Sequence, residues 1–273
     1  MFRADAHHHL WNLEVRDQPW IDPASPLRRS FGVDELAAVA RGFDATVLVQ
    51  TVTEPEETPE LLALAAEHEL IAGVVGWVDL TAPDVGDRLA ELRSDWLVGI
   101  RHQVQGEPDP RWLCRDDVRR GLRAVADAGL VYDLLTLPPQ LPAAIETAWA
   151  LDDLVFVVDH LSKPPIANGE LEPWASDVRA LAQHEHVSCK LSGMVTEADW
   201  STWTVADLAP YFEVVLEAFG PERLLFGSDW PVCTLAASYD EVVEAAEALT
   251  ASLSAAERAQ IFGETCRRTY TLA

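Results

Sequence analysis

Short apolar runs rich in β-branched residues alternate along the chain with longer stretches that carry hydrophobic residues at helical spacing. This alternation is typical of βα units that build a parallel sheet. Eight runs are expected to form strands, at residues 4–10, 45–51, 72–78, 97–104, 130–135, 154–160, 186–191 and 223–229. Eight strand–helix units in 273 residues predict an α/β fold, a (β/α)8 TIM barrel, as a single domain over residues 1–273.

The helical stretches between these runs carry start and stop signals. They are expected at residues 33–41, 59–68, 85–92, 116–128, 140–150, 174–184 and 206–219, with 239–249 and 254–262 after the last strand. Asp116 suits a helix N-terminus and Gly129 suits the residue after a C-terminus. No Gly-x-Gly-x-x-Gly follows a predicted strand, which argues against a dinucleotide-binding fold. The long connection at 12–32 predicts either a lid or a plain surface loop.

Two histidines stand two residues apart in the first predicted strand. Side chains alternate between the faces of a strand, so His7 and His9 are expected on one face, together with Asp5, and His8 on the other. Both imidazoles are then able to reach one metal ion or one substrate. Apolar residues, not a linker, follow the three histidines, unlike the pattern of an affinity tag.

Ionisable residues gather at the ends of at least six predicted strands, where a barrel of this kind places its active site. Each residue alone has an ordinary structural explanation, and their joint placement indicates a site. The set comprises His7, His9, Arg101, His102, Asp133, Asp159, His160, Lys163, Lys190 and Asp229.

Strand parity sorts some of these residues. In the seventh strand the apolar positions 187, 189 and 191 must face the helices, so Lys190 is expected to face the barrel interior. The same rule places Arg101 and His102 on opposite faces, so only one of them points inward. It also places His160 opposite Asp159.

Composition excludes several classes of partner. The net charge of -25 and the pI near 4.5 oppose binding to nucleic acid or to anionic membranes. No run approaches the roughly 20 apolar residues of a membrane span, and no basic–apolar leader is present, so a cytoplasmic protein is expected. The four cysteines form no C-x-x-C pair, which excludes a zinc ribbon or redox motif. Assembly into a homo-oligomer stays open.

Five segments, at residues 5–11, 99–102, 158–164, 189–193 and 226–231, together resemble the sugar-lactonase branch of the amidohydrolase superfamily. The resemblance runs in order over essentially the whole chain. It implies a (β/α)8 barrel that hydrolyses a small sugar-derived lactone, such as L-fucono- or L-rhamnono-lactone, by attack of water on the ester carbonyl.

The resemblance also assigns roles to residues. His7, His9, His160 and Asp229 correspond to metal ligands, and Asp229, with His160, to the catalytic residues, Asp229 acting as the general base. The fourth strand lacks the lysine that bridges two metals, and the fifth carries Asp133 where a histidine would be expected. One divalent ion, zinc on ligand type, or no metal at all, therefore stays open.

The remaining strand-end residues are expected to bind the substrate. They are Trp11, Trp77, Arg101, His102, Asp133, Lys163, Lys190 and Trp230. The cations would stabilise the developing oxyanion, and the tryptophans would stack on the sugar unless they pack in the core. The alternative function is a metal-dependent decarboxylase or C–C hydrolase of a small carboxylic acid, which would need more arginines at the site. A non-enzymatic barrel would lack His9, His160 or Asp229.

Overall fold

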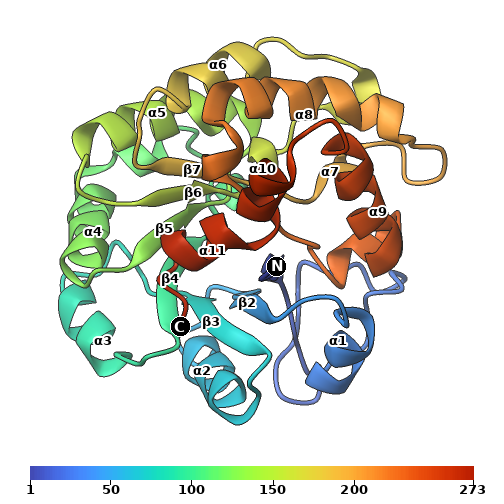
Figure 1. Cartoon of the computed structure of the whole chain (residues 1–273). Helices are drawn as coiled ribbons and strands as arrows, with labels where there is room; N and C mark the ends of the chain where they lie inside the picture. Colours follow the sequence, from blue (N-terminus) through green and yellow to red (C-terminus); the bar gives the residue numbers. More distant parts are fainter.

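The computed structural model describes residues 1–273 as one eight-stranded parallel sheet whose strands follow the order of the sequence (Figure 1). The strands are β1 (Ala4–His8), β2 (Ala45–Val49), β3 (Ile71–Gly76), β4 (Leu97–His102), β5 (Val131–Leu134), β6 (Phe156–Val158), β7 (Val187–Leu191) and β8 (Leu224–Phe226). The chain after β8 returns to the first strand: the Asp229 N–H donates to the His7 carbonyl (2.8 Å), and the His9 N–H donates to the Trp230 carbonyl (2.7 Å). The predicted (β/α)8 barrel is confirmed.

Helices surround the strands (Figure 1). They are α1 (Val33–Val39), α2 (Glu57–Glu67), α3 (Val85–Glu91), α4 (Asp116–Asp127), α5 (Leu141–Ala150), α6 (Trp174–Leu181), α7 (Met194–Glu197), α8 (Val205–Phe219), α9 (Tyr239–Leu249), α10 (Ala255–Ala259) and α11 (Thr265–Thr269). The expected helix at 254–262 is replaced by α10, a π-helical segment Gln260–Glu264 and α11. The short α7 was not predicted.

Local sequence explains several helix ends. Ser238 precedes α9, and its hydroxyl accepts a hydrogen bond from the Glu241 N–H (3.3 Å), while the Glu241 carboxylate accepts one from the Ser238 N–H (2.7 Å). This reciprocal pairing satisfies two backbone donors that the first helical turn leaves free. Gly129 adopts φ 71° just beyond α4, as its position after the predicted helix indicated.

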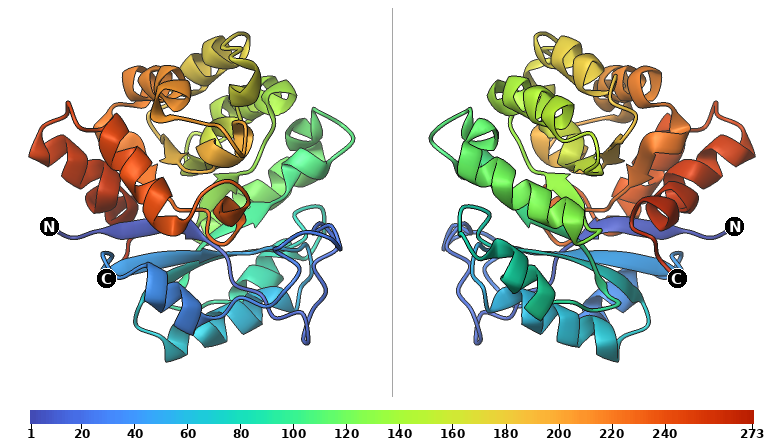
Figure 2. Two further views of the ribbon diagram at one scale, coloured as in Figure 1. Left: turned by 90° about the vertical axis from the view of Figure 1, so that its right-hand side faces the viewer. Right: turned by 90° about the vertical axis from the view of Figure 1, so that its left-hand side faces the viewer.

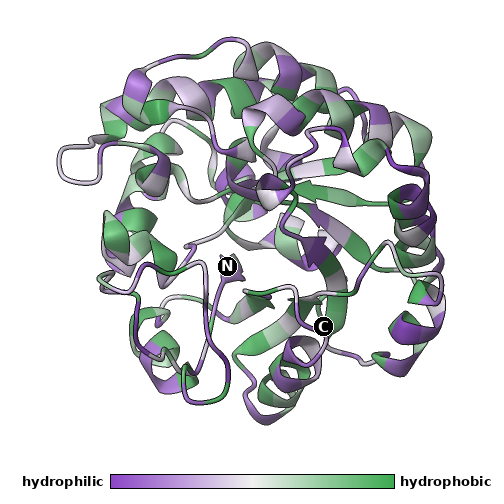
Figure 3. Cartoon of the chain, turned by 180° about the vertical axis from the view of Figure 1, so that it is seen from behind, coloured by the Kyte–Doolittle hydropathy of each residue, from purple (hydrophilic) through white to green (hydrophobic).

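The hydrophobic core has two parts, because alternate strand residues face opposite sides of the sheet. Small residues such as Ala6, Val47 and Val157 fill the barrel interior, and Tyr270 and Leu272 from the C-terminus pack against them. A larger cluster of 65 buried residues joins the outer face of the sheet to the helices. Figure 3 shows mainly hydrophobic strands surrounded by helices of mixed polarity.

Both termini lie at one end of the barrel, and the long connection at residues 12–32 lies at the other (Figure 2). This connection contains no helix, and an antiparallel bridge between Trp11 and Phe31 fastens its ends. No helix of the structure has both the length and the apolar character that a membrane span requires.

The sixth and eighth strands are shorter than predicted. Each has three residues, because the backbone turns sharply soon after the strand, with φ 52° at His160 and φ 56° at Asp229. Non-glycine residues rarely adopt such angles, and they do so preferentially at functional sites.

Candidate active site

His7 and His9 project into the barrel from the end of β1. Their Nε2 atoms lie 3.2 Å apart, and His9 Nδ1 lies 2.7 Å from the Val49 carbonyl. A carbonyl only accepts hydrogen bonds, so His9 carries its proton on Nδ1 and its Nε2 is free to bind a ligand.

Asp5 does not share this face, and that expectation is wrong. The pairing register of β1 with β2 shifts between Asp5 and His8, which offsets the strict alternation of side chains. The Asp5 carboxylate instead accepts hydrogen bonds from the Ser228 N–H (2.9 Å) and from the Tyr239 hydroxyl (3.0 Å). Asp5 therefore fastens the segment after β8 to the first strand.

Asp229 lies just after β8, where the barrel closes against β1, and its carboxylate faces three imidazoles. Its Oδ1 lies 3.5 Å from His9 Nε2, 3.7 Å from His7 Nε2 and 3.8 Å from His160 Nε2. Burial alone would raise the pKa of this carboxyl, but the neighbouring His160 and His9 outweigh burial and lower it. Asp229 is consequently ionised at neutral pH.

His160 reaches the same site through an unusual backbone. Four consecutive residues, His160–Lys163, have positive φ values between 52° and 60°. This left-handed turn directs both Asp159 and His160 toward the barrel axis, so the expectation from parity that they face opposite ways is wrong. The Nδ1 of His160 lies 2.8 Å from the Ser192 hydroxyl, and burial lowers the pKa of His160 to about 4.

Gly193 gives His160 the space for this position. It has φ 64°, and a Cβ atom placed on it would lie 2.7 Å from the Cγ of the His160 ring. A glycine is therefore needed here both for the backbone angle and for the approach of the imidazole.

A buried layer of charges lies beneath these histidines. Lys190 Nζ contacts Asp133 Oδ2 (2.5 Å), Asp159 Oδ1 (3.0 Å) and His7 Nδ1 (3.0 Å). Parity had placed Lys190 inside the barrel, and the structure confirms that orientation. Burial, followed by the Lys190 ammonium, lowers the pKa of His7 well below its ordinary value, so His7 is neutral. Lys190 and Asp133 were expected to bind the substrate, but both are fully buried, and neither lines the cavity that contains Asp229.

Arg101 is the inward-facing member of the pair in β4. Its Nη1 lies 3.0 Å from Asp159 Oδ2 and 3.3 Å from His7 Nε2. His102 faces away from the axis, where its ring stacks on Trp112 at 4.3 Å between centroids and accepts a hydrogen bond from the Trp77 indole N–H (3.0 Å). Neither His102 nor Trp77 lines the cavity.

Two other tryptophans also lie outside the site. Trp11 and Trp230 are both buried, and each packs edge-on against Phe31. The Trp11 indole N–H donates to the Arg29 carbonyl (2.6 Å). They hold the 12–32 connection in place, so core packing describes both better than contact with a sugar.

A cavity of about 160 Å³ is lined by Asp229, His9 and His160. This volume lies below the roughly 300–1,000 Å³ of pockets for drug-sized ligands, which favours a small ligand. Its lining residues are His9, Trp20, Thr51, Arg101, Gln103, Gln105, Leu135, His160, Lys163, Asp229 and Val232. Five of the predicted site residues are among them, namely His9, Arg101, His160, Lys163 and Asp229.

Sequence reasoning missed several members of this site. Trp20, Gln103 and Gln105 lie in connections whose path no periodic pattern describes. Glu197, 3.6 Å from Lys163 Nζ, is on the unpredicted α7. The one signal in the sequence for Trp20 was its aromatic side chain within the long connection at residues 12–32.

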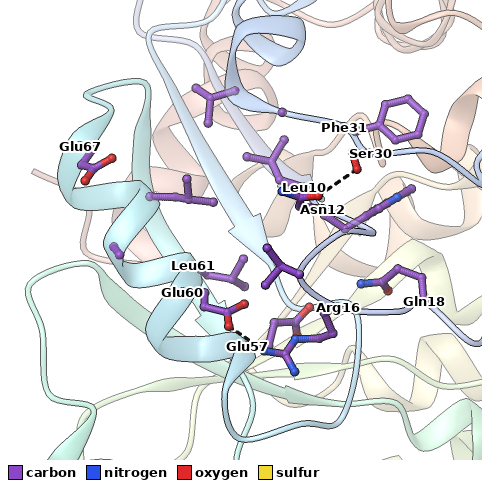
Figure 4. Close-up of a pocket in the computed structure, with 16 residues that line it drawn as sticks. Leu10, Asn12, Arg16, Gln18, Ser30, Phe31, Glu57, Glu60, Leu61 and Glu67 are labelled. Atoms are coloured by element: carbon purple, nitrogen blue, oxygen red, sulfur yellow. Dashed lines mark hydrogen bonds and ion pairs between the residues drawn. The ribbon is translucent and has the colours of Figure 1, made fainter.

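A second cavity, of about 470 Å³, lies between the 12–32 connection and α2 (Figure 4). Its walls include Leu10, Leu61 and the aliphatic part of Arg16. The Arg16 guanidinium pairs with Glu54 and Glu60, so its charge is satisfied within the protein. No histidine or cysteine lines this cavity, which places the candidate chemistry in the smaller one.

The donor atoms suit a divalent metal ion. His7 Nε2, His9 Nε2 and Asp229 Oδ1 form a triangle with sides of 3.2, 3.5 and 3.7 Å. Ligands bound tetrahedrally to zinc at 2.0–2.1 Å are about 3.4 Å apart. His9 has the hydrogen bond on its other nitrogen that orients metal-binding histidines. The residues present therefore fit one ion.

Comparison with known proteins agrees with this geometry. The chain is 42% identical over 284 residues to the L-fucono-1,5-lactonase of Burkholderia multivorans, covering 99% of this chain and 96% of that protein. It is 38% identical to the L-fucono-1,5-lactonase of Burkholderia ambifaria, covering 88% and 84%. A crystal structure of an amidohydrolase from Burkholderia multivorans with bound zinc matches with a TM-score of 0.96 and 40% identity, over 100% of both chains. The amidohydrolase family model matches residues 4–272, and the chain belongs to this family.

Proposed function

We propose that this protein is a hydrolase that opens the ring ester of a sugar-derived lactone, with L-fucono-1,5-lactone as the first substrate to test. The observation that carries the proposal is the Asp229 carboxylate in a small cavity, 3.5–3.8 Å from the Nε2 atoms of His9, His7 and His160. The two L-fucono-1,5-lactonases, at 42% and 38% identity, support the same substrate class.

Asp229 acts as the general base in this proposal. A water molecule next to its carboxylate attacks the lactone carbonyl carbon, and Asp229 takes the proton. When the tetrahedral intermediate collapses, the bond from the carbonyl carbon to the ring oxygen breaks. Asp229 then returns the proton to that oxygen, which leaves a hydroxy acid and an unchanged enzyme.

Two cations on the cavity wall can stabilise the oxyanion that develops on the carbonyl oxygen. Arg101 and Lys163 both line the cavity. Each has a carboxylate partner, Asp159 at 3.0 Å and Glu197 at 3.6 Å, that holds the cation in position. Fixed charges of this kind favour the transition state because they need no rearrangement during the reaction.

His7, His9 and Asp229 would hold a zinc ion, with His160 beside them. When bound, zinc would act as a Lewis acid on the substrate carbonyl and favour ionisation of a water molecule. Lys190 and Asp159 both contact the Nδ1 side of His7, at 3.0 and 3.3 Å, and so hold its ring with Nε2 toward Asp229.

The alternative, a decarboxylase or C–C hydrolase of a small carboxylic acid, has less support. A substrate carboxylate carries its full negative charge from the start, so its binding favours a wall with an excess of positive charge. Arg101 and Lys163, the cations lining the cavity, are both paired with carboxylates, so a neutral lactone fits this wall better.

The test is proton release from a panel of aldonolactones, comprising the L-fucono, L-rhamnono, arabinono and galactono compounds. The purified protein is assayed before and after chelation, and its metal content is measured. We expect hydrolysis of at least one six-carbon lactone. If no lactone is opened with or without added zinc, the proposal fails.

A further inference from the structure

Gln105 presents an unsatisfied hydrogen-bond acceptor at the cavity. Its side-chain oxygen Oε1 is buried and has no hydrogen-bond partner, although the residue lines the cavity that contains Asp229. Buried polar atoms in folded proteins are nearly always paired, so an unpaired one at a cavity calls for a partner from outside the chain. An amide oxygen accepts hydrogen bonds only, so this partner must be a donor such as a hydroxyl group.

The backbone holds Gln105 in place. It lies in the 3-10 turn Val104–Gly106, and its N–H donates to the Leu135 carbonyl at 3.0 Å. The neighbouring Gln103 uses its Nε2 to donate to the Thr51 carbonyl at 2.7 Å. The backbone that carries the Gln105 side chain is therefore fixed at the cavity before a ligand arrives.

Trp20 offers a different kind of surface to the same cavity. Trp20 is 44% exposed, and its indole N–H donates a hydrogen bond to Gln18 Oε1 at 2.7 Å. Gln18 itself is 1% exposed, and the Trp11 ring contacts Trp20 edge-on at 5.6 Å between centroids. With its only donor used, Trp20 has an apolar aromatic face left for a ligand.

We propose that Gln105 and Trp20 are specificity-determining residues for a polyhydroxylated ring. The Gln105 oxygen accepts a hydrogen bond from a ring hydroxyl, and the Trp20 indole packs on a C–H face of the same ring. A sugar lactone carries both features, whereas a simple lactone lacks the hydroxyls. This inference rests on the proposed lactonase function and specifies which part of the substrate is recognised.

The test compares a hydroxylated substrate with a bare one. L-Fucono-1,5-lactone and δ-valerolactone share a six-membered ring ester, but only the first has ring hydroxyls. The Gln105→Met variant keeps the side-chain length and removes the acceptor. One neutral hydrogen bond corresponds to about a 3- to 10-fold change, so kcat/KM should fall by that factor for fuconolactone and stay within about twofold for δ-valerolactone.

Trp20 is tested in parallel. Trp20→Ala should raise KM for fuconolactone about tenfold, and Trp20→Phe should restore most of the loss because it keeps an aromatic face. Gln183→Leu, at an exposed position on the outside of the barrel, is the matched control and should match the wild type with both substrates. An equal loss of both activities in Gln105→Met would indicate a merely structural role and overturn the proposal.

A binding measurement separates this inference from the lactonase proposal. The δ-lactam analogue of the sugar lactone resists hydrolysis, so its affinity can be measured by calorimetry even if no lactone is opened. We expect 3- to 10-fold weaker binding to Gln105→Met than to the wild type. Equal affinity would overturn the role of Gln105, while a failed hydrolysis assay with this difference in affinity would overturn only the reaction.

Discussion

Lys190 Nζ lies 3.0 Å from His7 Nδ1, so an ammonium group from β7 contacts the first-strand histidine inside the barrel. Lys190 is fully buried and also contacts Asp133 and Asp159. Tyr270, from the C-terminal end of the chain, donates its hydroxyl proton to Asp133 at 2.8 Å. One layer of paired charges therefore supports His7 from below and connects it to the residues that fill the barrel bottom.

Replacement of Lys190 should destabilise the protein strongly. Lys190→Met leaves the buried Asp133 without a cation and leaves Asp159 with Arg101 alone, and loss of one partner of a buried ion pair costs about 3–5 kcal/mol. The free energy of unfolding, measured by urea denaturation, should fall by this amount. Lys163→Met is the control, because Lys163 is partly exposed and its pair with Glu197 contributes about 0–1 kcal/mol. Equal stability of the two variants would contradict the role of Lys190.

Gly193 and Gly169 form a matched pair for testing the placement of His160. Both have positive φ, 64° and 69°, so alanine strains the backbone at each by about 1–2 kcal/mol. Only at Gly193 would the new Cβ meet the His160 ring, at 2.7 Å; nothing lies within 4 Å of it at Gly169.

Gly193→Ala should therefore lower kcat by about 100-fold, the loss typical of a displacement of about 1 Å at an active site. Gly169→Ala should keep nearly all activity, despite a similar loss of stability. Lactone hydrolysis and thermal unfolding of both variants provide the measurement. Full activity in Gly193→Ala would show that His160 does not need its present position.

Asp229→Asn should abolish most of the turnover. The amide cannot take a proton from water, and general base catalysis contributes about 10²- to 10⁴-fold, so kcat should fall within that range. Circular dichroism should show an unchanged fold. Asp240→Asn, at an exposed position of α9, is the control and should retain full activity. Retained turnover in Asp229→Asn would remove Asp229 as the base.

His102 should make stability depend on pH. The Trp77 indole N–H can only donate, so it holds His102 Nδ1 unprotonated, and His102 Nε2 donates to Glu107 at 2.7 Å. Burial is the largest cause that lowers the pKa of His102 below its ordinary value of 6.5, and the hydrogen bond to Glu107 opposes it only in part.

A lowered histidine pKa means that the unfolded chain binds the proton more readily. The contribution of His102 is thus present above about pH 6.5 and is lost as the pH falls toward its pKa in the folded state. The difference in unfolding free energy between wild type and His102→Gln should be larger at pH 7.5 than at pH 5. If the difference in unfolding free energy between the two proteins were constant or grew at low pH, His102 would not be the source of the pH dependence.

Strand periodicity predicted much of this architecture, because the alternation of side chains along a strand depends only on residues close together in the sequence. The order of the eight strands and the inward direction of Lys190 follow from apolar runs and parity alone. Parity fails at Asp5, where the register shifts, and at His160, where the backbone turns left-handed. Neither event has a local signal, since no glycine marks them.

Contacts between segments that are distant in the sequence could not be predicted from it either. Tyr270 reaches Asp133 only because the C-terminus folds back under the barrel. Trp20 reaches the cavity because its connection is fastened by the bridge between Trp11 and Phe31. Such placements depend on the path of irregular segments, which hydrophobic periodicity does not describe.

The hydrogen bond from the Ser228 N–H to Asp5 joins residues 223 positions apart in the chain, next to the pair formed by His7 and Asp229. During translation the histidines of β1 are made long before Asp229, the carboxylate that completes their cluster. Until then β1 has an unpaired edge, which is open to contacts with other chains. A nascent chain therefore carries the histidines of this candidate site without their carboxylate until β8 and the segment after it have been made.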